Sequence, residues 1–178
     1  MSQASNYVAW CIRKAEKEIE ECKKMNKRPK HRGLLKSKPN NEVAQNHLEK
    51  AEENLRFAIS LEAEKYGYKI IEALFYCMYQ CFLSIAGKFG YESRNQTCTI
   101  SLIEYLTEEN KIVLDKKFIE MMKYKEDQED KGYPSMIDMR EDYTYSAKIS
   151  VEKEKIDSLT LICKELIEKT KEIIYPQD

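Results

Sequence analysis

Apolar side chains recur every three or four residues along most of this 178-residue chain, with Lys and Glu between them. That spacing is typical of amphipathic helices, whose inner faces repeat with the period of the helix. We expect a first helix over about 4–25, a second from Asn41, and a last helix after Ser150, since Asn and Ser are good N-caps. Between these the pattern predicts helices over roughly 66–87, 99–107 and 110–126, and an irregular segment over 127–149.

The predicted helix 66–87 is apolar on most of its circumference rather than along one stripe, and such a helix belongs at the centre of a bundle. The whole chain holds only five Gly and four Pro, so it is rich in helix formers and has few breaks. Its length is typical of one domain. The sequence therefore predicts an all-α fold, an antiparallel up-down helix bundle of five to six helices.

The best candidate for a linker lies after the first helix, where Pro29, Gly33 and Pro39 interrupt the helical pattern. We therefore divide the chain into an N-terminal helix (1–25), a basic linker (26–41) and a helical bundle (42–178).

Charge is distributed unevenly. Residues 23–38 hold eight Lys or Arg and no acid, whereas the other 22 basic residues are outnumbered by all 31 acidic residues of the chain. A local basic block attracts phosphate groups even when the net charge is close to zero. Two interpretations stay open: a solvated flexible connector, or a nucleic-acid-binding segment with contacts from Lys27, Arg28, Lys30 and Arg32.

The N-terminus lacks the pattern of a secretory signal, and the most apolar run, 70–86, is interrupted by polar residues. We expect a cytoplasmic protein that has no membrane contact. The six cysteines fall mostly on apolar helical faces, so in a reducing compartment they are interpreted as small core residues. With only two histidines in the chain, the sequence predicts no metal site and no cofactor.

Two polar clusters are candidates for ligand binding. The first is "GYESRNQTCT" (90–99), directly after the central helix, where Arg94, Asn95 and Gln96 supply donors beside a helix N-terminus. The alternative for this cluster is an ordinary loop in which Asn95 or Thr97 caps the next helix.

The second cluster is "MREDYTYS" (139–146). Arg140 offers a planar fork suited to a phosphate, and Glu141 and Asp142 could orient it. Tyr143 and Tyr145 could stack on a base or donate a hydrogen bond. The alternative is a salt bridge that holds the segment against the bundle.

These segments together resemble a known family. "HLEKAEENLRFAISL" (47–61), "EALFYCMYQCFLSIAGKFGYESRNQTCT" (72–99) and "MREDYTYS" before a terminal amphipathic helix are similar to the HEPN domain of prokaryotes, and most to an archaeal-type branch of it. The resemblance covers roughly 42–175, so the first helix and the basic linker look like a branch-specific extension. It implies a four- or five-helix bundle, usually a two-fold dimer.

Many HEPN proteins are metal-independent ribonucleases or toxins, often paired with a nucleotidyltransferase antitoxin. The family motif is an Arg followed, after four to six polar residues, by a His. By resemblance Arg140 takes the arginine role, but Tyr145 stands where the His is expected and Gln80 replaces the family's helix-3 His. Tyrosine titrates near pH 10 and is a poor base at neutral pH.

We therefore expect a HEPN-like homodimer that binds RNA or a nucleotide, as part of a toxin-antitoxin or defence-type system, with a degenerate catalytic motif. The dimer is also expected because the central helix has more apolar surface than a small bundle covers. A nucleotidyltransferase antitoxin is a possible partner by resemblance. The alternative function is a metal-independent ribonuclease toxin that uses Arg140 and Tyr145, with Glu141.

Overall fold

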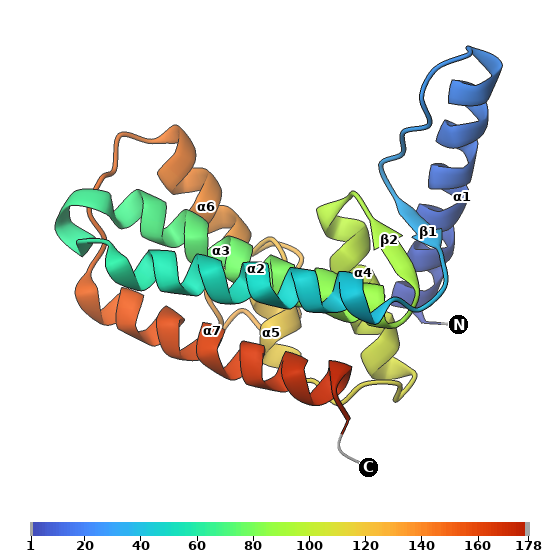
Figure 1. Cartoon of the computed structure of the whole chain (residues 1–178). Coiled ribbons are helices and arrows are strands. Elements are labelled where there is room, and N and C mark those ends of the chain that lie inside the picture. The colour runs from blue at the N-terminus through green and yellow to red at the C-terminus, as the bar shows by residue number, and fades with distance from the viewer. Residues whose placement is uncertain (1, 177–178) are drawn as a thin grey trace.

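The computed structural model describes residues 2–176, and within them the chain forms seven helices and one two-stranded sheet. Helices α2 (Asn41–Ser60), α3 (Ala63–Lys88) and α7 (Lys153–Ile174) pack side by side as a three-helix layer (Figure 1). Helix α6 (Met136–Tyr145) packs on α3 from the other side. The prediction of an all-α helical bundle is confirmed, but the described residues form seven helices rather than the five to six expected.

Helix α3 is the core of the molecule. It contributes most of the largest fully buried side chains, among them Phe75, Met78 and Phe82, and it is in contact with α2, α4, α6 and α7. It is also the one described helix long and apolar enough to cross a membrane, but most of that apolar stretch is buried by its neighbours. Since one chain covers α3, its apolar surface no longer argues for a dimer, and the homodimer stays a prediction.

The N-terminal part of the chain forms a projection at one end of this layer (Figure 1). Helix α1 (Gln3–Lys24) packs against α4 (Gln96–Glu108). The chain then returns as strand β1 (Leu34–Lys36), which pairs antiparallel with β2 (Tyr91–Ser93), Leu35 lying opposite Glu92. The predicted linker thus contains a strand, which the sequence pattern missed because three residues are too few to show alternation.

Three predicted elements were wrong in extent. The helix expected over 110–126 is only α5 (Lys116–Met121). Asn110 adopts a left-handed φ of 53° after α4, so the chain turns, and the Asp115 side chain caps the new helix by accepting from the Lys117 N–H.

The segment 127–149, expected to be irregular, contains α6. Its N-cap is Ser135, whose hydroxyl accepts from the Asp138 N–H at 3.1 Å. Met136 and Ile137 are buried, but the polar residues after them blur the helical period. Helix α7 also begins later than expected, after Glu152 rather than Ser150.

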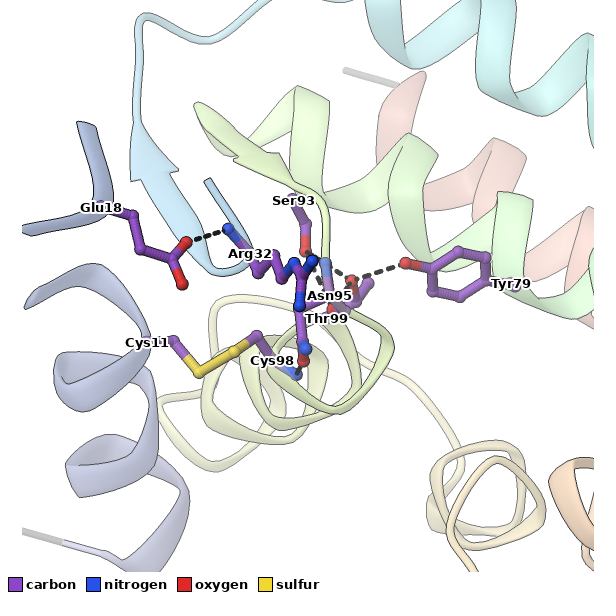
Figure 2. Close-up of a disulfide and its surroundings, with 8 residues drawn as sticks. All are labelled: Cys11, Glu18, Arg32, Tyr79, Ser93, Asn95, Cys98 and Thr99. Atoms are coloured by element: carbon purple, nitrogen blue, oxygen red, sulfur yellow. Dashed lines mark hydrogen bonds between the residues drawn. A yellow bond between two sulfur atoms is a disulfide. The ribbon is translucent and has the colours of Figure 1, made fainter. Parts of the chain in front are cut away.

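Five of the six cysteines fall into two groups, and the sixth, Cys22, is a partly exposed free thiol. Cys77, Cys81 and Cys163 are buried in the core, as expected. Cys11 of α1 and Cys98 of α4 instead form a disulfide (Figure 2), which corrects the expectation that all six serve as reduced core residues. The cytoplasmic location remains a prediction.

Candidate functional site

The largest uncompensated charge lies on residues 23–38, which we call the basic arm. It runs from the last turn of α1 through β1, at the projecting end of the molecule (Figure 1). All eight of its Lys and Arg residues are exposed. Within residues 2–176 none of the eight forms an ion pair, although thirteen such contacts lie outside the arm.

The backbone of the basic arm is nevertheless anchored. The buried His31 ring lies 3.4 Å from the carboxylate of Glu92, and the Arg32 N–H donates to Glu18 of α1 (Figure 2). Gly33 packs so closely on α1 that a Cβ there would lie 2.3 Å from the Cys11 carbonyl oxygen. The arm is therefore held by its backbone and small residues, while its charged side chains extend into solvent.

The arm is also joined to the polar cluster at 94–96. Arg94 is exposed and pairs with Glu92 at 2.9 Å. The side chain of Asn95 accepts from the Cys98 N–H at 2.9 Å (Figure 2), so Asn95 is the N-cap of α4, as the alternative interpretation proposed. Gln96 is the first residue of α4 and is partly exposed.

Arg140 has quite different surroundings. Its guanidinium carbon lies 4.6 Å from the ring centre of Phe75 on α3, and its Nη2 donates to Glu141 at 3.0 Å. The hydroxyl of Tyr124 donates to the same carboxylate oxygen at 3.0 Å. Burial, together with that hydrogen bond, raises the pKa of Tyr124. The Arg140 side chain is only 23% exposed.

The other residues of the "MREDYTYS" segment do not converge on Arg140. Asp142 pairs with Lys148, and the Lys148 ammonium lies 5.9 Å from the ring centre of the partly buried Tyr143. Tyr145 is 85% exposed at the end of α6. Because five residues correspond to about 140° around a helix, Arg140 and Tyr145 leave α6 on different faces.

The two predicted polar clusters are linked only through the core. Phe75, beneath Arg140, stacks on Tyr79 with ring centres 6.2 Å apart. The Tyr79 hydroxyl lies 3.3 Å from Thr99 in the first turn of α4 (Figure 2). No hydrogen bond or ion pair within residues 2–176 joins Arg140 directly to Arg94, Asn95 or Gln96.

A pocket of about 370 Å³ opens between the start of α1, α4 and the segment after α5, and sequence analysis missed it. Its walls include Tyr7, Tyr124 and several carboxylates, Glu104, Glu108 and Asp127 among them. The acidic lining disfavours a phosphate there. Within residues 2–176 no three His, Cys, Asp or Glu side chains are grouped so that they could hold a metal ion.

An ion network around the buried Glu120 forms part of the wall of this pocket, which Glu104 and Lys123 line. The Glu120 side chain is 1% exposed; it accepts from the Lys123 ammonium at 3.0 Å and from the Glu129 N–H at 2.7 Å. Glu104 lies 2.7 Å from the same ammonium. Burial lowers the pKa of Lys123, but its hydrogen bonds to Glu104 and Glu120 and the attraction of their charges together outweigh burial, and its net pKa is raised.

His47 lies next to Gln80, the residue that stands where the HEPN resemblance leads us to expect a histidine. His47 of α2 lies 2.6 Å from the side-chain oxygen of Gln80 on α3. Burial lowers the pKa of His47, a hydrogen bond with Gln80 partly offsets this, and Lys50 lowers the pKa further. The His47 ring is therefore neutral at pH 7.

Comparison of the chain with known protein families, with characterised proteins and with solved structures finds no match. The function therefore has to be argued from the geometry above and from the resemblance carried by the sequence.

Proposed function

We propose that this protein is a HEPN-like helical module that binds RNA, and that its basic arm makes the phosphate contacts. The observation that carries the proposal is the exposure of all eight cations of the arm without a carboxylate partner among residues 2–176. An unpaired cation can neutralise a phosphate and release its counterions, which is the main source of sequence-independent affinity.

The anchoring of the arm supports the same proposal. His31 and Gly33 hold the backbone against α1 and β2, so binding does not have to order a free linker, and less of the interaction energy is lost. Outside residues 23–38 acids exceed basic residues. The field of the molecule therefore directs a polyanion to the arm and away from the rest of the surface.

The proposal is tested by the salt dependence of binding. Changing Lys27, Arg28, Lys30 and Arg32 together to Ser removes up to four phosphate contacts. The slope of log affinity against log salt for a single-stranded RNA should become shallower by about 3, since each contact contributes roughly 0.7.

A matched control removes the same charge from another surface, by changing Lys131, Lys153, Lys155 and Lys164 to Ser. These four are exposed, and none has an ion-pair partner within residues 2–176. The control slope should stay close to that of the wild type. Equal slopes for all three proteins would overturn the proposal.

The alternative, a metal-independent ribonuclease using Arg140 and Tyr145, has less support. Arg140 faces α3, and Tyr145 leaves α6 on another face. We expect no cleavage of a mixed RNA pool that depends on Arg140 in the absence of metal. Cleavage by the wild type that is lost in Arg140→Ala would instead favour the ribonuclease.

The partners implied by the HEPN resemblance remain part of the proposal. A homodimer would have twice the chain mass of 21.0 kDa in light scattering. Co-purification with a small nucleotidyltransferase would support a toxin-antitoxin system.

A further inference from the structure

We infer that the outer face of α1 is a stacking platform for the bases of single-stranded nucleic acid, built by Tyr7 and Trp10. The inference rests on the proposed function and deepens it, because it states that the nucleic acid bound by the basic arm is single-stranded.

The first observation is the side of α1 on which its aromatic residues lie. The inner face, which packs on α4, consists of small or medium residues: Ala4, Val8, Cys11 and Ala15. Trp10, the only tryptophan of the chain, is 44% exposed, and Tyr7 is 37% exposed. Burial alone would place the two largest apolar groups of the helix inside. Their rings instead lie outside, with centres 5.3 Å apart.

The second observation is that this face leads into the basic arm. Tyr7, Trp10, Lys14, Lys17 and Lys24 follow one another at steps of three, four or seven residues, so they share one side of the helix. Lys17 is paired there with Glu21 at 4.0 Å, so the unpaired cations of this side are Lys14 and Lys24. The Lys14 ammonium lies 5.1 Å from the centre of the Trp10 ring. From Trp10 to Lys24 the helix rises about 21 Å, and the chain continues there into the remaining cations of the arm.

Exposed aromatic rings followed by unpaired cations are the combination by which proteins hold single strands: bases stack on the rings, and the phosphates lie along the positive surface. A duplex cannot use the rings, because its bases are already stacked inside it. The platform therefore selects single-stranded nucleic acid. The cations alone would bind single strands and duplexes without distinguishing them.

The neighbouring pocket sets the direction of the strand. Tyr7 forms part of its wall, and beyond Tyr7 lie Glu104, Glu108 and Asp127. Carboxylates repel phosphates at this range. The sugar-phosphate backbone of a strand stacked on Trp10 must therefore run toward Lys24 and the arm, rather than toward the start of α1.

The test compares Trp10→Ala with the wild type on an unstructured single-stranded RNA and on an RNA duplex of equal charge. We expect affinity for the single strand to fall by about 5- to 150-fold, equivalent to about 1–3 kcal/mol. Duplex affinity and both salt slopes should be unchanged. Trp10→Phe should retain most of the affinity, and in the wild type the single strand should quench the fluorescence of the sole tryptophan.

Phe57→Ala is the matched control, since Phe57 is an exposed aromatic residue, 51% accessible, in the last turn of α2, whereas the arm leads into the first turn of that helix. It should bind both RNAs like the wild type. Equal single-strand affinities for Trp10→Ala and the wild type overturn the platform. If the Ser variants of the arm still flatten the salt slope, the proposed function survives that result; if they do not, both proposals fall.

Two other occupants of the aromatic face would also overturn the inference. Trp10→Ala that lowers the mass of a dimer in solution, with RNA affinity unchanged, would make the face a contact between two copies of the chain. Loss of binding to anionic lipid vesicles with RNA affinity unchanged would make it a membrane-facing surface.

Discussion

Arg140 and the two arginines of the basic arm lie in opposite surroundings. Arg140 on α6 lies on the Phe75 ring, donates to Glu141 and is mostly covered. Arg28 and Arg32 in the basic arm are exposed, and neither has an ion-pair partner within residues 2–176. Sequence analysis made both regions candidates for phosphate binding: Arg140 because of its acidic and tyrosine neighbours, and the arm because of its eight cations without an acid.

The difference separates two uses of charge. A cation whose partners lie inside the fold stabilises the fold, and its loss is measured by unfolding. A cation without such a partner is free to attract a polyanion, and its loss is measured by binding. We therefore expect variants around α6 to change stability and variants of the arm to change affinity.

The largest effect on stability is expected from the covalent attachment of the arm. Replacing both Cys11 and Cys98 by Ala removes a disulfide that spans 87 residues, and we expect a loss of about 4 kcal/mol in unfolding free energy. Hydrogen exchange should accelerate in α1 and β1 before it does in α3. Cys22→Ala, which removes a free thiol, is the control and should cost little. Equal exchange in both variants would mean that α1 is held by packing alone.

A smaller loss, about 3 kcal/mol, is expected for Glu120→Gln. The change removes the buried carboxylate and leaves the partly buried Lys123 with Glu104 as its only acidic partner, and breaking an ion pair with a buried member is costly. Chemical denaturation measures it. Glu129→Gln, in an exposed pair with Lys116, should cost less than about 1 kcal/mol. A fall in RNA affinity per folded molecule in Glu120→Gln would contradict the expectation that only variants of the arm change affinity.

Arg140→Ala sharpens the comparison most directly. Loss of the contact with Phe75 and of the hydrogen bond to Glu141 should cost about 1–2 kcal/mol in stability. RNA affinity per folded molecule should stay within about two-fold of the wild type. Arg140→Lys keeps the charge but loses the flat guanidinium, and should recover only part of the stability. An affinity loss of roughly 10-fold or more with unchanged stability would restore α6 as the binding site.

The smallest effect concerns pH. The pKa of His47 is lowered in the folded state, chiefly by burial, so below the ordinary value of about 6.5 the unfolded chain binds more protons than the folded one. Stability should therefore fall as pH decreases from about 6.5 toward 5. In His47→Gln this part of the decrease should disappear, while losses at lower pH from the carboxylates remain. Parallel curves for the two proteins between pH 6.5 and 5 would contradict the expectation.

The helices with strong apolar period were predictable. The exposed charges and the buried faces of α2 and α7 repeat at helical spacing, α3 is a long run that is apolar on most sides, and Asn40 and Asn41 mark the start of α2 within one residue. Helix α6 was not predictable in this way, because only Met136 and Ile137 of its ten residues are buried. Its start depends on Ser135, whose capping role is visible only once the helix is known.

The candidate sites also include features that the sequence could predict and features that it could not. The charge of the basic arm follows directly from composition, and its exposure is confirmed at Lys27, Arg28, Lys30 and Arg32. The surroundings of Arg140 did not follow, because the contact with Phe75 joins residues 65 positions apart in the chain. The pairing of Cys11 with Cys98 has the same cause: no local pattern identifies which of six cysteines will meet. The sequence did contain one unused signal, the heptad-like placing of Tyr7 and Trp10 opposite the small residues of α1.

The disulfide between α1 and α4 also makes a closed covalent ring of residues 11–98, and the basic arm lies on that ring. A protease that cuts after exposed Lys or Arg residues meets many such sites in the arm. One cut there opens the ring without dividing the molecule, since residues on both sides remain joined through Cys11 and Cys98. The nicked chain migrates as one species until a thiol reductant is added, and only then releases the fragment that carries α1.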